Sequence, residues 1–221
     1  YILQEGNTLY ALKEYEKACE KYLSLRETNM RSAQIFLYAA QCKRMAKTDT
    51  LQILALQDSA VACFKKPYPK DAAPSLLERS NTLLELGRYR EAIADLNEYE
   101  HLMSNELTAY FYYRREQAEM QCRMFQQAVD DIDRAIRMEP KEPLYHAERA
   151  VVYYRLGEFE EALKSAQKSA ELNPKFGDAY RLAGICQLRL NQREKGLSNL
   201  KKAIEFGDES EQAILAEETQ P

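Results

Sequence analysis

A 34-residue interval recurs through the C-terminal half of this chain of 221 residues. Two small residues, seven positions apart, mark each interval: Ala128 and Ala135, Ala162 and Ser169, Gly196 and Ala203. Stacked helical hairpins repeat with this period, because a single hairpin cannot bury its own apolar face. We therefore predict an all-α chain whose function lies on a surface built by several repeats.

The composition agrees with this prediction and excludes several classes of protein. Gly and Pro number only seven each, which is sparse for a loop-rich or all-β chain. The net charge of −4 disfavours nucleic acid, because phosphate binding needs clustered Lys and Arg. No run of about 18 apolar residues is present, so no membrane span is expected. The five cysteines lack metal-binding spacings, and we expect neither a metal nor a cofactor.

The clearest unit runs from Pro143 to Phe176. Pro143 suits a first helical turn, where its missing N–H has no partner to lose. Gly157 suits the left-handed conformation that ends a helix. A second helix is expected from about Phe159 to Leu172. The unit is thus predicted to be two helices joined by a tight turn.

This unit resembles a tetratricopeptide repeat, whose pattern has an aromatic residue, Leu-Gly, Tyr, and then Ala, Phe, Ala and Pro. The residues that agree are Tyr153, Gly157, Phe159, Ala162 and Pro174. His146 stands at the first aromatic position, and Arg149 and Ala150 replace the Leu-Gly pair. The resemblance implies a right-handed α-solenoid. The segment from Asn173 to Asp208 also resembles members of this family from Bacteroidetes-type bacteria, many of which are exported.

About six units follow one another in the expected solenoid of residues 1–210. Their predicted bounds are 1–32, 33–72, 73–108, 109–142, 143–176 and 177–210. Residues 211–221 are expected to form a partial capping helix and a tail. In the second unit we place an insertion of about three residues near Thr48 to Thr50, which assigns Ala55 and Ala62 to the small-residue positions of its second helix.

In the family, the first helices of the hairpins line a concave groove, and the resemblance implies that the fifth, ninth and twelfth residues of each unit face it. Four successive units carry a side-chain amide at the ninth place: Asn7, Gln41, Asn81 and Gln117. A ladder of amides can hold the main chain of an extended peptide without reading its side chains. The alternative is that Asn and Gln merely suit a solvated helix face.

Apolar and aromatic residues are expected on the same face: Leu37, Leu77, Leu84, Tyr110, Tyr113, Met120 and Tyr154. Exposed apolar patches tend to mark binding sites. The alternative is that several of these residues pack against the next repeat and are never exposed.

Some heat-shock chaperone adaptors of the family hold a terminal carboxylate with basic residues in successive first helices. Here the corresponding fifth position is Leu3, Leu37, Leu77, Tyr113 or Ala147 in five units. Only Arg181 is basic at this position, so we expect the clamp to be missing. Arg181 remains a candidate groove residue for an acidic partner segment.

We therefore predict a non-enzymatic module that binds a protein or peptide in the groove, with no catalytic residues. The two histidines, His101 and His146, have no Ser or Cys nucleophile placed beside them. The carboxylate pairs Asp130–Asp131 and Glu160–Glu161 are expected on exposed second helices. The alternative function is structural assembly or self-association through the convex face or terminal repeats. The partner's identity and the oligomeric state stay open, and the lineage resemblance favours the periplasm or cell envelope slightly over the cytoplasm.

Overall fold

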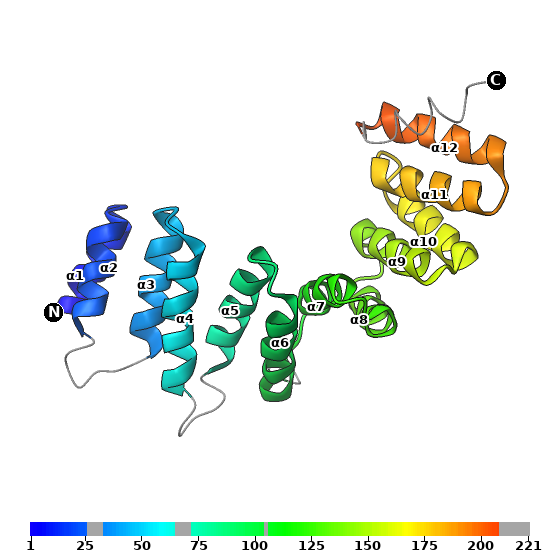
Figure 1. The fold of residues 1–221 in the computed structure, drawn as a ribbon. Helices are drawn as coiled ribbons and strands as arrows, with labels where there is room; N and C mark the ends of the chain where they lie inside the picture. The colour runs from blue at the N-terminus through cyan, green and yellow to red at the C-terminus, as the bar shows by residue number, and fades with distance from the viewer. Residues whose placement is uncertain (26–32, 65–71, 104–105, 208–221) are drawn as a thin grey trace. The chain divides into compact units, whose positions relative to one another are not determined.

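The computed structural model describes residues 1–25, 33–64, 72–103 and 106–207. These residues form twelve α-helices and no β-strand (Figure 1). The helices are α1 (Ile2–Ala11), α2 (Tyr15–Ser24), α3 (Ala33–Met45), α4 (Thr50–Phe64), α5 (Ala73–Glu85), α6 (Tyr89–Met103), α7 (Ala109–Gln121), α8 (Phe125–Met138), α9 (Pro143–Leu156), α10 (Phe159–Leu172), α11 (Gly177–Arg189) and α12 (Arg193–Glu205). The predicted capping helix and tail of residues 211–221 lie outside the described part of the chain.

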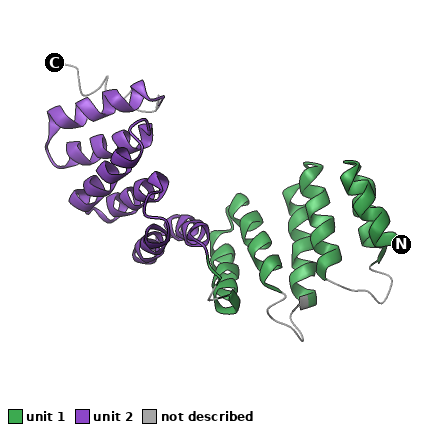
Figure 2. Ribbon diagram, turned by 180° about the vertical axis from the view of Figure 1, so that it is seen from behind, with its two compact units in different colours: residues 1–107 green, residues 108–221 purple. Residues whose placement is uncertain are grey.

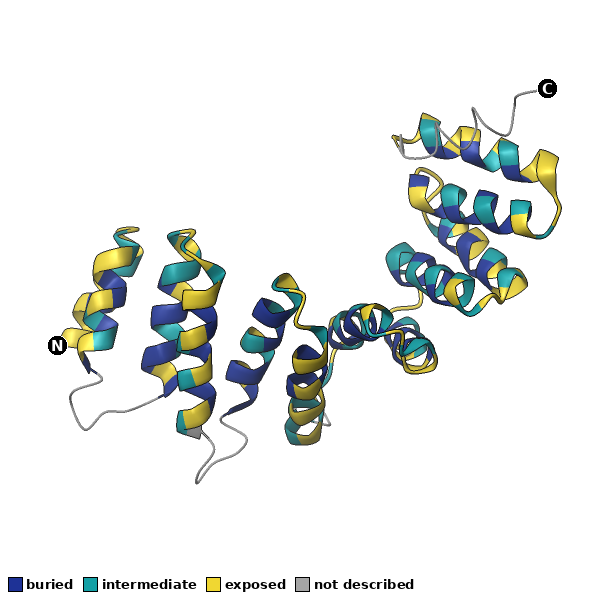
Figure 3. Cartoon of the chain, in the orientation of Figure 1, coloured by how far each residue is buried: buried dark blue, intermediate teal, exposed yellow. Residues whose placement is uncertain are grey.

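The helices group into two compact units, residues Tyr1–Leu107 and Thr108–Pro221 (Figure 2). Unit 1 contains α1 to α6, and unit 2 contains α7 to α12. Within each unit the buried residues lie where neighbouring helices meet, and the exposed residues lie on the outer sides (Figure 3). None of the helices among the described residues has the length and apolar character needed to cross a membrane.

Each hairpin reverses at one residue with left-handed backbone. These residues have φ between 54° and 83°: Lys13, Lys47, Gly87, Arg123, Gly157 and Asn191. Glycine takes this conformation freely, whereas other residues accept a cost of about 1 kcal/mol. The turn offsets that cost through its hydrogen bonds. In the turn between α7 and α8, for example, the N–H of Arg123 donates to the carbonyl of Met120 at 3.1 Å. The N–H of Met124 donates to the carbonyl of Glu119 at 2.8 Å.

The turn residues also locate the extra residues of the longer repeats. Lys47 and Gly87 are 40 positions apart, whereas Gly157 follows Arg123 by 34. The predicted insertion near Thr48 to Thr50 is wrong in size. Helix α4 begins at Thr50, three residues after the turn residue, whereas α10 begins two residues after its turn at Gly157. The turn therefore carries one extra residue.

This smaller insertion changes which face of α4 is buried. Ile53 and Ala60 are buried, whereas Ala55 and Ala62, the predicted packing residues, are exposed. Apolar residues occur on several sides of α4, so the helical period of the sequence alone does not select which face is buried. Packing against α3 and α5 makes the selection.

Small residues allow the two helices of a hairpin to approach closely. A Cβ on Gly184 would lie 2.8 Å from the side chain of Leu200 and 3.0 Å from the carbonyl oxygen of Gly196. A Cβ on Gly196 would lie 2.9 Å from the side chain of Leu188. Both glycines are therefore needed for the spacing of α11 and α12. Alanine serves in the second helix of other hairpins, and Ala128 and Ala162 have no exposed surface.

Buried ion pairs join the helices of two hairpins. In α7–α8, Arg115 Nε donates to Asp131 Oδ2 at 2.5 Å and Nη2 donates to Oδ1 at 2.9 Å, with the residues 5% and 3% exposed. In α5–α6, Arg79 binds Asp95 in the same two-pronged way. The prediction that Asp131 is a solvated surface carboxylate is therefore wrong, because arginine from the facing helix compensates its charge. Arg149 stands at the corresponding place in α9, where its Nε donates to Ser165 Oγ of α10 at 3.1 Å and its Nη1 donates to Asp133 Oδ1 of α8 at 3.2 Å.

Candidate functional site

A pocket opens among the first three helices of unit 1. Asn7 and Tyr10 of α1, Tyr22 of α2, and Tyr38 and Gln41 of α3 line its volume of about 210 Å³. We call it the tyrosine pocket. The rings of Tyr22 and Tyr38 are tilted, with their centroids 5.2 Å apart. The lining residues carry phenols and amides and no charged side chain.

The first hairpin builds most of the pocket wall. Gly6 faces the Tyr22 ring so closely that a Cβ at this position would lie 2.7 Å from the ring. The Tyr22 hydroxyl donates to Asn7 Oδ1 at 2.8 Å. Tyr10 packs edge-on against Tyr15, with a centroid separation of 5.4 Å. A small residue at one place therefore lets an aromatic ring lie against α1 and be held by an amide.

The phenols of Tyr10 and Tyr22 are neutral at neutral pH. Burial is the main cause of a raised pKa at Tyr22, and nearby Cys42 raises it further. Burial also raises the pKa of Tyr10, with a further contribution from Tyr15. Both hydroxyls therefore keep their protons, and the pocket presents aromatic surface and hydrogen-bonding groups without charge.

Two of the four predicted amides meet at this pocket. Asn7 uses its carboxamide oxygen to accept from Tyr22, and its two N–H donors bond to none of the described residues. Gln41 is exposed, and its side chain makes no hydrogen bond within the described part of the chain. These groups are available to the main chain of a partner, although the amide ladder as a whole remains a prediction.

The other candidate residues of unit 1 are half-buried. They are Leu37, Leu77, Asn81 and Leu84. Leu37 packs against a cluster that includes Phe36 and Ala60, and Leu84 packs against Leu54 and Ala92. These contacts agree with the alternative that apolar residues of the first helices pack on neighbouring helices.

In unit 2 the candidate residues have partners within the protein. Gln117 donates to the Tyr113 hydroxyl at 2.8 Å and accepts from Arg114 at 3.0 Å. Met120 packs against a cluster formed by Ala128, Val129 and Val152. The Tyr110 side chain is the most exposed of this set, at 56%.

Two further candidates lie on α9 and α11. The Tyr154 hydroxyl accepts from Arg189 at 3.2 Å, and its ring lies 5.4 Å from that of Phe159. Arg181 pairs with Asp178 on its own helix at 3.1 Å. An acidic partner segment would therefore have to compete with an existing carboxylate for Arg181.

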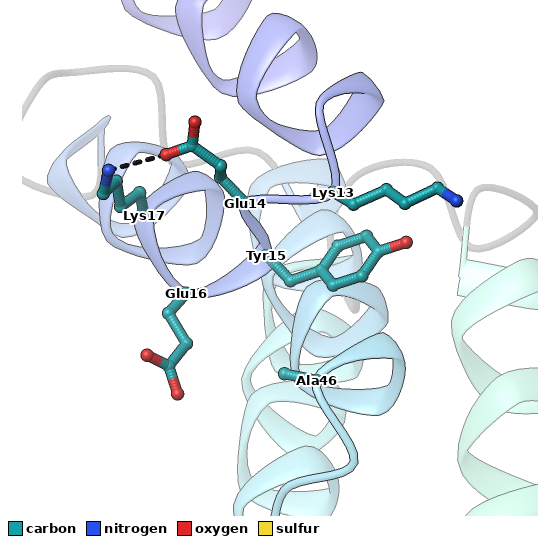
Figure 4. Close-up of a pocket in the computed structure, with 6 residues that line it drawn as sticks. All are labelled: Lys13, Glu14, Tyr15, Glu16, Lys17 and Ala46. Atoms are coloured by element: carbon teal, nitrogen blue, oxygen red, sulfur yellow. Dashed lines mark ion pairs between the residues drawn. The ribbon is translucent and has the colours of Figure 1, made fainter.

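A second hollow, of about 320 Å³, lies at the turn of the first hairpin. It is lined by Lys13, Glu14, Tyr15, Glu16, Lys17 and Ala46. Lys17 and Glu14 form an ion pair at 2.6 Å, while Lys13 and Glu16 point away from each other (Figure 4). The side chains do not converge on one point, so this hollow is a poor candidate site. Within the described ranges, no group of three or more His, Cys, Asp or Glu is placed to hold a metal ion.

Sequence reasoning missed Tyr22 and Tyr38 as pocket residues. Tyr22 lies on a second helix, and Tyr38 directly follows the predicted groove residue Leu37. The signal that could have found Tyr22 is Gly6, because a glycine at a helix contact leaves space for a large facing ring.

Comparisons with known proteins identify the repeat. The family model described as tetratricopeptide repeat matches residues 143–176. The Hsp70-Hsp90 organizing protein of Triticum aestivum is 26% identical over 72% of this chain and 26% of its own length. Hsp70-Hsp90 organizing protein 2 of Arabidopsis thaliana is 28% identical over 96% of this chain and 35% of its own length. The chain thus spans about a quarter to a third of these curated relatives.

Solved structures show the same fold. YrrB, described as a TPR protein with an unusual peptide-binding site, has a TM-score of 0.72 and 20% identity, covering 90% of this chain and 98% of that chain. The C-terminal part of a TPR repeat-containing protein from Cytophaga hutchinsonii has a TM-score of 0.73 and 16% identity, covering 98% and 84%.

At these identities the likeness concerns the fold. It confirms the predicted all-α solenoid of helical hairpins and the likeness to bacterial repeat proteins. These matches indicate no enzymatic family, and proteins built from such hairpins serve in protein–protein interaction. Residues 143–176 thus match the tetratricopeptide repeat by sequence, and the chain shares the fold of solved proteins built from that repeat.

Proposed function

We propose that this chain is a non-enzymatic module that binds an extended peptide on the first helices of its hairpins, with the tyrosine pocket as one contact point. The observation that carries the proposal is the meeting of Asn7 and Gln41 with three phenols in that pocket. The amides suit the main chain of a peptide, and the rings suit one side chain.

The size and charge of the pocket support a peptide ligand. A volume of about 210 Å³ is smaller than the range of roughly 300–1,000 Å³ typical of small-molecule sites, but it accommodates one side chain. The lining is uncharged, so a charged side chain would lose its hydration without gaining an opposite charge. We therefore propose that the pocket takes an uncharged, apolar or aromatic residue of the peptide.

The ligand we propose differs from a segment held by its terminal carboxylate. The names of the curated relatives refer to Hsp70 and Hsp90. In unit 1, the fifth position of each repeat holds Leu3, Leu37 or Leu77 in place of a basic residue. Without cations there, a terminal carboxylate has no strong partner at those places.

The experiment compares two exposed glutamines. A peptide selected against the wild-type chain from a displayed random library is titrated by calorimetry into wild type, Gln41→Ala and Gln52→Ala. Gln41 lines the pocket, whereas Gln52 is exposed on α4 and lines neither pocket. Losing one or two hydrogen bonds predicts a Kd about 3- to 10-fold higher for Gln41→Ala.

Gln52→Ala should bind as wild type does, and both variants should melt at the wild-type temperature because the two side chains are exposed. A Kd unchanged in Gln41→Ala, or raised equally in both variants, would contradict the proposal. A selected peptide rich in Asp and Glu would contradict the choice of an uncharged residue.

A further inference from the structure

Two carboxyl groups on neighbouring first helices of unit 2, those of Glu116 and Glu148, lie close enough for the charge of one to act on the other. Helices α7 and α9 are the first helices of successive hairpins. The chain reverses twice between them, so they run in the same direction. Tyr113 of α7 and Tyr145 of α9 bring the helices together, with ring centroids 5.6 Å apart. Glu116 and Glu148 each follow one of these tyrosines by three residues and so lie one turn further along the same faces. We call Glu116 and Glu148 the carboxyl pair.

Glu116 occupies a place where other hairpins carry a small residue. It lies seven residues before the turn residue Arg123, as Ala150 does before Gly157 and Gly184 before Asn191. Glu116 is only 1% exposed, and neither carboxyl oxygen has a hydrogen-bond partner among the described residues. Glu148 is half-buried and is thus the more accessible member of the pair, which we call its rim. A buried carboxyl without a hydrogen-bond partner destabilises the folded protein, so the presence of Glu116 at this place needs an explanation.

The surrounding charges do not compensate Glu116. Glu119 on its own helix, whose pKa burial raises to about 8, and Asp131 on α8 add acidic groups beside Glu116, and the positive charge of Arg115 is engaged by Asp131. On the α11 side, Arg181 is paired with Asp178. Burial, then Glu148, and then the other two carboxyls raise the pKa of Glu116 to about 9. In the free protein, a proton therefore neutralises Glu116 at pH 7.

Burial is also the main cause of a raised pKa at Glu148, and Asp178 raises it further while Arg181 lowers it. A cation that reaches the rim would stabilise both carboxylates at once. The ring of Tyr113, half-buried beside the pair, offers an additional favourable surface to a cation.

We propose that the carboxyl pair receives the ammonium or guanidinium group of a lysine or arginine side chain from a partner polypeptide. The cation bonds to Glu148 at the rim, and its charge favours the ionised form of Glu116 beneath it. Glu116 then releases its proton to the solvent, so the site exchanges one positive charge for another. This inference concerns unit 2 and is independent of the tyrosine pocket.

The test uses hexalysine amide as a probe, titrated into the full chain by calorimetry at pH 7 in phosphate and in Tris. These buffers differ in ionisation enthalpy, so the difference in heat counts the protons released. We expect release of up to about one proton per bound chain of the probe. Glu116→Gln/Glu148→Gln should raise the Kd at least about 10-fold and abolish the proton release, because charge-assisted hydrogen bonds are lost.

The matched control is Glu160→Gln/Glu161→Gln, which replaces the same number of carboxyl groups at exposed positions on α10. Its Kd should change by less than about 2-fold, with proton release intact. Circular dichroism checks the fold of each variant, and Glu148→Gln alone replaces the double variant if the latter unfolds. Equal weakening in both double variants, binding without proton release, or no binding of hexalysine to wild type would overturn the proposal.

Discussion

The same place in two hairpins holds opposite chemistry in the two units. Gly6 in unit 1 and Glu116 in unit 2 each lie seven residues before the left-handed turn residue of their hairpin. The glycine admits the ring of Tyr22 and leaves an uncharged pocket. The glutamate instead buries a carboxyl opposite Glu148. The difference shows that the hairpin scaffold fixes a position in space, while the residue there decides between an aromatic contact and a buried acid.

The largest expected effect comes from removing the cation that supports the acidic interior of unit 2. Arg115→Met removes the bidentate partner of buried Asp131 and leaves it Arg134 at 3.7 Å, with Glu116 and Glu119 nearby. Breaking a buried pair from one side costs about 3–5 kcal/mol, which urea unfolding of the chain measures. Arg88→Met is the control, because its pair with Glu91 on unit 1 is exposed, and its stability should not change measurably. Equal stability of the two variants would show that Asp131 is compensated by other groups.

Transferring the residue of unit 2 into unit 1 should have the next largest effect. Gly6→Glu places side-chain atoms where a Cβ already lies 2.7 Å from the Tyr22 ring, so α1 and α2 must separate. We expect the free energy of unfolding to fall by about 3 kcal/mol, because the new side chain overpacks the helix contact and buries a carboxyl group. Ala11→Glu, at an exposed position of the same helix, provides the comparison. If both variants unfold at the same denaturant concentration, α1 does not need glycine at this place.

The acid of unit 2 should make stability depend on pH. Below about pH 4.5 the Glu116 carboxyl is protonated in both the folded and the unfolded chain, and its contribution is constant. Above that pH the unfolded chain releases the proton, whereas the folded chain holds it up to about pH 9. Stability is therefore lost as the pH rises through this window.

Glu116→Gln removes this dependence. We expect it to stabilise the chain by about 2 kcal/mol at pH 8 and by little at pH 4, measured by urea unfolding. Glu119 on α7, whose pKa is also raised, to about 8, Asp131 on α8 and Glu148 on α9 are present in both proteins, so the difference reports Glu116 together with its coupling to these groups. A stability difference that is the same at both pH values would show that Glu116 is ionised in the folded chain.

The smallest expected effect concerns the hydroxyl that completes the neutral pocket. Tyr22→Phe keeps the ring beside Gly6 but removes the 2.8 Å hydrogen bond to Asn7. A loss of about 1 kcal/mol in the free energy of unfolding is expected, as for a part-buried hydrogen bond. Tyr22→Leu should lose more, because the ring itself fills the space. A Phe variant as unstable as the Leu variant would mean that the hydroxyl, and not the ring, holds the wall in place.

The repeat pattern predicted the helices better than it predicted the sites. Gly157 and Pro143 mark the bounds of α9, because backbone freedom and a missing N–H act locally. Lys13 and Arg123 give no such signal, yet they adopt the same left-handed turn. Their conformation is imposed by the hydrogen bonds that close each hairpin and by the contact between its helices.

The candidate groove shows the same limit. Asn7 and Gln41 were predicted from their place in the repeat, and they do meet at one pocket. The register did not reveal that Gln117 is already bonded to Tyr113, because side-chain partners depend on distances between helices.

The sequence by itself determined the helical hairpins, their approximate period and the small residues at their contacts, because these follow from local conformational preference and from the need to bury one face of each helix. Only the tertiary structure decided which face of α4 is buried, that Arg115 compensates Asp131, and that Gly6 and Glu116 create different surroundings. These outcomes depend on contacts between side chains of different helices, whose volumes and charges must fit one another. No local sequence pattern specifies which of these contacts form.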